Sequence, residues 1–391
     1  MNHDRPDHPR RDAAEDRRAT SLWAGPGLPP SEKLPEASGA RFHLIKAYEP
    51  ERDGYHWLKG VALAVAGDRL VATFGHNACA SGENNATEVT NARISDDCGR
   101  TWSPLHTVDA PEGELATSHG VLLARGDEVW AFNGAFYGTG RAGGRVHTRA
   151  CVADAATIAT GSPVWTRRGV VAWDGFWPLQ EPFLMDDGRY VVAGASVGGG
   201  EGGNTIPAVA LVDADDLTAW EVVRIPCPTR IWGESTVIVQ GPDLLLISRS
   251  NRERLAALVS RSHDYGRTWS DLEWSDLPMA DSKPYAGTLS DGRHYLINTV
   301  CADVDTSGRN PLSILVGGPG RMECDTAYRL IDARWPLPGA EGYTHWAYPY
   351  AVEHDGHLWV GFYMGTKDKH GSGAAGMVVV PTASLRSGAI Q

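Results

Sequence analysis

The chain has 391 residues, of which 42% are hydrophobic and 21% are charged, an ordinary composition for a globular protein. Its formal net charge of −12 argues against nucleic acid or an anionic membrane surface as the main partner, although a local basic pocket could still bind an acidic ligand. No run of 18 apolar residues is present, so no membrane span is expected.

The N-terminal part of the chain differs in composition from the rest. Residues 1–39 are charged and then rich in Pro and Gly, which predicts a disordered or extended N-terminal segment. The opening MNHDRPDHPRRDAAEDRR lacks the apolar core of a signal peptide, so a cytoplasmic location is expected. The six Cys show no metal-ligand spacing and are expected to be reduced thiols. Neither a cofactor nor a metal is predicted.

From residue 40 onward one pattern recurs six times: an apolar run, a turn with Asp or Gly, and a second apolar run. The units begin at positions 60, 119, 181, 234, 283 and 348. Self-similarity at this period is typical of a radial β array, so residues 40–391 are predicted to form one all-β domain, a six-bladed β-propeller, with seven blades as the alternative. The last unit has too few strands, and residues 40–50 are expected to supply its outermost strand and close the ring.

An eight-residue pattern, Ser-x-Asp-x-Gly-x-Thr-Trp, occurs at 95–102 and again at 262–269, which are 167 positions apart. That separation fits three blades of about 56 residues. In each copy the Asp can accept hydrogen bonds from its own turn, the Gly can take a positive φ, and the Trp can pack beneath. The pattern therefore predicts a self-capped hairpin turn with a structural role.

Polar side chains lie at the ends of the predicted inner strands. His76 can act as a general acid or base, and Asn77 and Glu83 belong to a polar loop suited to sugar hydroxyls. Glu181 and Glu234 each begin an inner strand. Carboxylates paired across a channel can cleave a glycosidic bond, or one of them can bind sugar or pair with an Arg.

Cationic and aromatic residues complete the predicted site. A tyrosine nucleophile needs a neighbouring base, which Glu234 could supply to Tyr348. Arg249 and Arg309 could bind a carboxylate in bidentate fashion, and Lys283 could add positive charge. The remaining candidates for contact with substrate are His119, Trp232, Tyr285 and Tyr350.

The repeated turn resembles the Asp box of the sialidase superfamily, and the resemblance covers roughly residues 50–365. It implies a propeller in which Glu234 activates a nucleophilic Tyr348, with Tyr350 as an alternative, and in which Arg249 and Arg309 are similar to two of the three arginines that hold the substrate carboxylate.

Two departures from the sialidase pattern stand in the first unit. GYHWLKGVAL replaces Phe-Arg-Ile-Pro and leaves His56 or Lys59 near the place of the third arginine. FGHNACASGENNATEV contains no Asp that matches the general acid. His76 is instead similar in placement to a His of related propeller enzymes that act on rhamnosyl-glucuronate linkages by hydrolysis or elimination.

The sequence thus predicts an exo-acting glycoside hydrolase that removes a terminal sugar from an acidic, uronate- or sialate-like oligosaccharide. Two alternatives stay open. One is a lyase of the rhamnose–glucuronate type that works by β-elimination, and the other is a propeller that binds a glycan or a protein without catalysis. An oligosaccharide is the expected partner, and the oligomeric state is not predicted.

Overall fold

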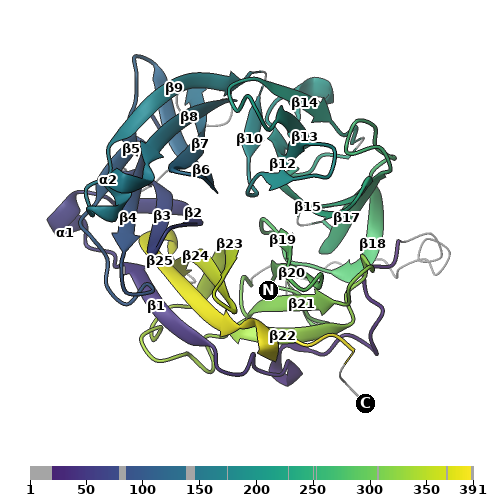
Figure 1. Cartoon of the computed structure of the whole chain (residues 1–391). Helices are drawn as coiled ribbons and strands as arrows, with labels where there is room; N and C mark the ends of the chain where they lie inside the picture. Colours follow the sequence, from purple (N-terminus) through teal and green to yellow (C-terminus); the bar gives the residue numbers. More distant parts are fainter. Residues whose placement is uncertain are drawn as a thin grey trace, which may run out of the picture.

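Six antiparallel sheets stand around a central axis in the computed structural model (Figure 1). The prediction of an all-β, six-bladed propeller is confirmed, and the seven-bladed alternative is wrong. The structure describes residues 20–78, 85–137, 146–173, 175–227, 229–249, 251, 253–305, 308–366 and 369–388.

Each of the first three blades runs outward from the axis in chain order (Figure 1). Blade one contains β2 (Trp57–Ala66), β3 (Arg69–Asn77), β4 (Val89–Ser95) and β5 (His106–Asp109). Blade two contains β6 (Leu115–Arg125), β7 (Glu128–Tyr137), β8 (Val146–Asp154) and β9 (Trp165–Ala172). Blade three contains β10 (Phe176–Pro178), β12 (Arg189–Ser196), β13 (Ile206–Asp213) and β14 (Trp220–Arg224), with β11 (Phe183–Leu184) paired to β12.

Blades four and five repeat this order, and blade six joins both ends of the chain. Blade four contains β15 (Ser235–Gln240), β16 (Asp243–Ser248), β17 (Ala256–Ser262) and β18 (Glu273–Pro278). Blade five contains β19 (Tyr285–Thr288), β20 (His294–Asn298), β21 (Leu312–Gly317) and β22 (Thr326–Ile331). Blade six contains β23 (His345–His354), β24 (His357–Thr366), β25 (Lys369–Pro381) and, outermost, β1 (Arg41–Lys46).

Helices are few and short in the described residues. They are α1 (Pro50–Asp53), α2 (Ala155–Ala159) and the 3-10 helices η2 (Ser31–Lys33), η3 (Glu201–Gly203) and η4 (Thr382–Ser384). Within this part of the chain no helix has the length and apolar character needed to span a membrane.

The ring closes through strand β1. It pairs antiparallel with β25, from Arg41 opposite Val379 to Lys46 opposite Ala375, and in Figure 1 the purple β1 lies along the yellow β25. The predicted closure by residues 40–50 is therefore confirmed. Ile45 of β1 is fully buried in the largest hydrophobic core, so this strand contributes packing as well as backbone hydrogen bonds.

The segment before β1 follows the outside of blades four and five. Isolated parallel bridges join Thr20 to Ser275, Trp23 to Cys324 and Glu36 to Arg329. Leu22 and Leu34 are each 2% exposed and pack in the core that these two blades share. Residues 20–39 are thus an extended strap, while residues 1–19 of the predicted N-terminal segment lie outside the described residues.

The two Asp boxes have the same geometry, and each connects the third and fourth strands of its blade. In blade one the Asp97 carboxylate accepts hydrogen bonds from the Thr101 amide (2.8 Å) and hydroxyl (2.7 Å), and the Trp102 indole donates to the Gly99 carbonyl. Asp264 holds Thr268 in the same way in blade four. The boxes lie three blades apart and act as self-capped turns, which confirms both predictions.

The inner strands of blades one, two and six each contain a β-bulge. The pairing register shifts between Lys59 and Ala62, between Thr117 and Gly120, and between Ala347 and Tyr350. A bulge interrupts the alternation of buried and exposed side chains. For this reason the predicted unit starts at 60, 119 and 348 fall inside the bulges, although the strands begin three or more residues earlier.

We expect β1 to be a structural part of blade six. Replacing the buried Ile45 by Ala should lower the free energy of unfolding by roughly 2–5 kcal/mol, because a cavity is left in the core. The matched control is Leu44→Ala in the same strand, where the side chain is 39% exposed and the loss should be about 0.5 kcal/mol. Urea denaturation followed by tryptophan fluorescence measures both. Equal losses for the two variants would contradict the packing role of β1.

Candidate active site

Glu234 and Arg249 face each other at the open end of the β15–β16 hairpin. The ladder begins with Ser235 opposite Ser248, so the residue before β15 and the residue after β16 are neighbours. The Arg249 amide donates to the Glu234 carbonyl at 2.8 Å, and its guanidinium donates through Nη1 to the Glu234 carboxylate. Its Nε donates to Asp281 Oδ1 at 2.7 Å. Arg249 is therefore fixed between two carboxylates.

Tyr348 projects from the bulge of β23 onto this ion pair. Its hydroxyl donates to Glu234 Oε1 and accepts a hydrogen bond from Arg249 Nη1 at 3.1 Å. Its φ is 57°, in the left-handed region, which costs a non-glycine residue of order 1–3 kcal/mol. The backbone thus holds an unfavourable conformation that places a phenol against a carboxylate, as the activation of a tyrosine nucleophile requires.

Two further cations lie against the ring of Tyr348. Lys59 Nζ is 4.5 Å from the ring centre, and the Arg309 guanidinium carbon is 5.7 Å from it. Arg309 also donates to the Tyr363 hydroxyl and to the Asp281 carbonyl. Of the two residues near the place of the missing sialidase arginine, Lys59 lies in the site. His56 contacts Tyr48 instead, with 3.3 Å between its Nδ1 and the Tyr48 hydroxyl.

The charges of the site keep Glu234 ionised. Burial raises the pKa of its carboxyl, but the positive charges of Arg249 and Lys59 outweigh burial and lower the pKa to about 2. Burial likewise disfavours the charged form of Arg249, and the Glu234 charge reverses this and raises the pKa of Arg249 well above its ordinary value. Glu234 is thus a carboxylate able to accept the phenolic proton of Tyr348.

A polar chain reaches Tyr348 from blade two. The Ser118 hydroxyl donates to Glu88 Oε1 and lies 3.2 Å from His119 Nδ1. The His119 ring stands edge-on to the Tyr348 ring, 5.9 Å between centres. It also occupies the space next to Gly60, where a Cβ would come within 2.1 Å of the imidazole, so this position requires glycine.

Two members of this chain were not predicted. Glu88 is the last acidic residue of the stretch FGHNACASGENNATEV, in which no match to the general acid was found, and Ser118 directly precedes His119. Each of the two residues lies next to the end of a predicted strand, and this position could have indicated them. Both are buried, so their hydrogen bonds decide their orientation.

His76 is buried in blade one, and its contacts lie outside this cluster. Its ring stacks on Tyr55 at 4.3 Å, and its Nδ1 lies 3.1 Å from the Asn91 amide nitrogen. Burial, helped by Lys46, lowers the pKa of His76 well below its ordinary value. Among the described residues, no contact joins His76 to Glu234 or Tyr348. Asn77 follows it and is buried, and Glu83 lies outside the described residues.

Four other predicted residues form a layer deeper along the axis or at its edge. The Tyr285 and Tyr350 hydroxyls donate to the carbonyls of Ala351 (3.0 Å) and Leu122 (3.1 Å), and both side chains are at most 2% exposed. Lys283 is also buried. Burial raises the pKa of Glu181 to about 8, so its carboxyl is largely protonated at neutral pH. Tyr348 rather than Tyr350 is therefore the tyrosine that meets Glu234.

Trp232 borders the site on the blade-four side. The Arg249 guanidinium carbon lies 5.0 Å from its ring centre, and the tryptophan directly precedes the turn that leads into Glu234. The described residues thus bring together Glu234, Arg249, Tyr348, Arg309, His119 and Trp232 from the predicted set, and they add Lys59.

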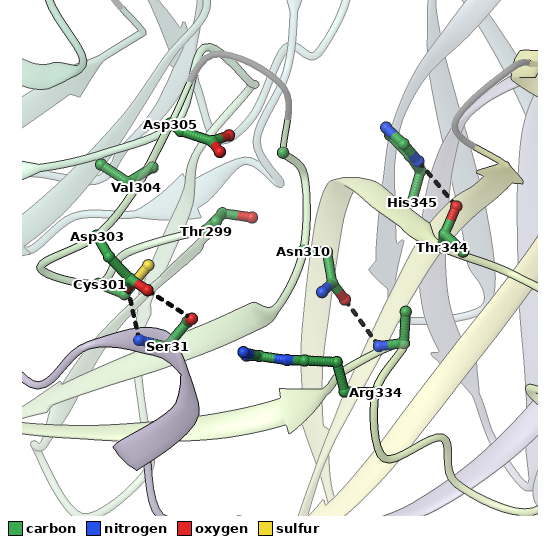
Figure 2. Close-up of a pocket in the computed structure, with 12 residues that line it drawn as sticks. Ser31, Thr299, Cys301, Asp303, Val304, Asp305, Asn310, Arg334, Thr344 and His345 are labelled. Atoms are coloured by element: carbon green, nitrogen blue, oxygen red, sulfur yellow. Dashed lines mark hydrogen bonds between the residues drawn. The ribbon is translucent and has the colours of Figure 1, made fainter.

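A cavity of about 340 Å³ is lined by residues of blades five and six and of the N-terminal strap, and none of its lining residues belongs to this cluster (Figure 2). Ser31 of the N-terminal strap closes one side and is held by Asp303, and Arg334 and His345 line other sides. Asn310, the residue after Arg309, also lines it. In the described part of the chain no group of three His, Cys, Asp or Glu side chains is arranged to hold a metal ion.

Glu234 and Glu181 should affect stability with opposite dependence on pH. The folded-state pKa of Glu234 lies below its unfolded value, so its stabilisation is present above about pH 4.5 and is lost as the pH falls towards 2. The folded-state pKa of Glu181 lies above its unfolded value, so the folded state loses stability as the pH rises from about 4.5 to 8.

Urea denaturation of the two Glu→Gln variants at pH 3, 5 and 8 measures this difference. The advantage of the wild type over Glu234→Gln should grow between pH 3 and pH 5. Relative to the wild type, Glu181→Gln should gain stability between pH 5 and pH 8. A Glu234→Gln difference that stays constant from pH 3 to pH 5 would show that Glu234 is not held ionised by its neighbours.

Comparison with known proteins agrees with this architecture. Residues 178–360 match the family described as BNR repeat-like domain. A search of curated proteins gave no match. Among solved structures, a Hadza microbial sialidase superposes with a TM-score of 0.67 and 14% identity over 87% of this chain and 68% of its own.

Two further structures have similar scores. A protein of unknown function from Dyadobacter fermentans gives a TM-score of 0.61 and 15% identity over 88% of this chain and 100% of its own. The Trypanosoma rangeli sialidase gives 0.60 and 15% over 92% of this chain, which spans 60% of that protein. At such identities the similarity shows a shared fold. The chain is therefore a six-bladed propeller whose fold is shared with sialidases, and its residues 178–360 match a BNR repeat-like domain.

Proposed function

We propose that the protein is an exo-acting glycoside hydrolase that removes a terminal sugar from an acidic, uronate- or sialate-like oligosaccharide. One observation carries the proposal: the Tyr348 hydroxyl is bonded to both Glu234 and Arg249, while Lys59 and Arg309 lie against the same ring. This arrangement combines an activated nucleophile with cations at one point. The sialidases among the structures of similar fold add support for a glycan substrate.

In the proposed first step the Tyr348 oxygen attacks the anomeric carbon and passes its proton to Glu234. An ordinary tyrosine has a pKa near 10 and is a poor nucleophile at neutral pH, so it needs an adjacent base. The bond from the anomeric carbon to the leaving oxygen breaks, and a glycosyl-tyrosine forms. Water then attacks the same carbon and gives a proton to the group that protonated the leaving oxygen in the first step. The bond from the carbon to the tyrosine oxygen breaks, the tyrosine recovers its proton from Glu234, and the sugar leaves with retained configuration.

The charge balance of the cluster supports an acidic substrate. Lys59, Arg249 and Arg309 gather around Tyr348, and a substrate carboxylate would be attracted to these three cations. Arginine suits this task because its planar fork binds a carboxylate through two parallel hydrogen bonds.

His119 is our candidate for the proton donor to the leaving oxygen. It is the imidazole next to Tyr348, and the Ser118 hydroxyl connects it to the Glu88 carboxylate. A carboxylate behind an imidazole fixes its tautomer and stabilises its charged form, as general acid–base catalysis requires. The same contacts also allow a second candidate, β-elimination next to a uronate, in which His119 or Tyr348 removes the C5 proton while the cations neutralise the carboxylate.

Product analysis separates these reactions. Sialyl-, rhamnosyl-glucuronyl- and arabinosyl-oligosaccharides are incubated with the protein in H₂¹⁸O and examined by mass spectrometry. Hydrolysis adds one labelled oxygen to the released sugar, whereas elimination adds none and leaves an unsaturated uronate that absorbs ultraviolet light. Binding without any product would favour the non-catalytic alternative.

Tyr348→Phe should lower kcat/KM by roughly 10³-fold or more, because the phenylalanine ring fills the space but offers no oxygen. Tyr350→Phe is the matched control. Its hydroxyl bonds to the backbone of Leu122 in the buried axial layer, so its loss should cost about 1 kcal/mol of stability and leave kcat/KM within a few-fold. Steady-state kinetics and thermal unfolding measure both effects. A larger loss of activity in Tyr350→Phe would exclude Tyr348 as nucleophile.

His119→Gln should lower kcat about 10²- to 10⁴-fold for substrates whose leaving group is a sugar, because such a group needs a proton. The loss should be small for a 4-nitrophenyl glycoside, whose leaving group departs as an anion. His76→Gln should show no such dependence on the leaving group, since its described contacts lie elsewhere. If His76→Gln, rather than His119→Gln, shows this dependence on the leaving group, the proton donor is His76.

A further inference from the structure

The bulge that presents Tyr348 leaves a buried carbonyl next to it. Pro349 has no N–H, and Tyr348 and Pro349 fall between the paired residues Ala347 and Tyr350, outside the ladder. The Pro349 carbonyl instead accepts a hydrogen bond from Lys283 Nζ at 2.8 Å. A buried carbonyl without a donor would cost about 1–3 kcal/mol, so the bulge depends on this amine.

Lys283 reaches the bulge from a different blade. It lies two residues before β19 of blade five, and its side chain is 3% exposed. Its second hydrogen bond goes to the Leu179 carbonyl at 3.0 Å, directly after β10 of blade three. One amine therefore ties the inner ends of blades three and five to the bulge of blade six across the axis.

The amine can keep both bonds whatever its protonation state. Burial lowers the pKa of Lys283 to about 7, and the nearby Glu234 charge opposes this only in part. A charged ammonium has three N–H groups and a neutral amine has two, which matches the two carbonyls. Titration of Lys283 thus leaves the geometry of the bulge intact.

We propose that Lys283 is a positioning residue: its bond to the Pro349 carbonyl holds the left-handed turn at Tyr348 and so keeps the Tyr348 hydroxyl on Glu234. This inference rests on the proposed function, in which Tyr348 is the nucleophile. A strained φ persists where the surroundings over-determine it. Here the hydroxyl is fixed at one end of the residue by Glu234 and Arg249, and the backbone is fixed at the other end by Lys283.

Lys283→Met tests the proposal, with Gln180→Met as the matched control. Gln180 is also a buried polar side chain at the axis, and it bonds to the backbone of Val237 and Ala286, away from the bulge. Both variants remove buried hydrogen bonds, so both should lower the melting temperature. Lys283→Met should in addition lower kcat about 10- to 100-fold with KM within three-fold, because the nucleophile is displaced while the cations remain.

Chemical rescue separates positioning from general destabilisation. In Lys283→Ala, added propylamine should raise kcat in a saturable way, whereas propanol and tetramethylammonium should not, since neither offers two N–H donors. A loss of kcat in Lys283→Met no greater than in Gln180→Met, or the absence of amine rescue in a folded Lys283→Ala, would overturn the proposal.

The crystal structure of Lys283→Met gives a readout that needs no activity. We expect φ of Tyr348 to leave the left-handed region and its hydroxyl to move away from Glu234. An unchanged turn would contradict the proposal. If the wild-type protein cleaves none of the oligosaccharides, the proposed function fails, and this structural comparison still decides whether Lys283 holds the turn.

Discussion

Three β-bulges on neighbouring inner strands determine which side chains reach the axis. They lie in blades six, one and two, which are consecutive around the ring; Tyr348 and His119 lie within their bulges, and Lys59 directly precedes its bulge. A regular ladder would direct successive side chains alternately to the two faces of each blade, towards the adjacent blades. The bulges break that alternation, and Tyr348 contacts both Lys59 and His119.

The opposite side of the site is built on a different principle. Glu234 and Arg249 come from the open end of a regular hairpin in blade four, and Arg309 comes from the β20–β21 connection of blade five. These side chains carry most of the charge, and the bulged blades carry the phenol and the imidazole. Charged strand ends thus meet a displaced tyrosine across the ring. The side chain of Lys283, from blade five, bonds to the backbone of that tyrosine's bulge.

The sequence was informative where a local pattern carries the structural information. The two Asp boxes and the period of the apolar runs favoured six blades over the alternative of seven, and their resemblance to sialidases pointed to Glu234, Arg249, Arg309 and Tyr348. The sequence was less informative where a contact between distant residues decides which side chains reach the candidate site. Both His76 and His119 were predicted to lie in the central pocket. His119 lies on β6, the innermost strand of its blade, and its ring meets Tyr348, whereas His76 lies on β3, the second strand of its blade, and its ring meets Tyr55. Glu88 and Ser118 were missed because their hydrogen bond joins two blades.

The closure of the ring and the left-handed turn at Tyr348 belong to one sheet. Blade six contains the bulged β23 at the axis and β1 at the rim, with β24 and β25 between them. The left-handed turn at Tyr348 stores strain, and strain persists where neighbouring packing leaves no room to relax. Strand β1 completes this sheet at its rim, so the blade that closes the ring is also the blade that contains the left-handed turn at Tyr348.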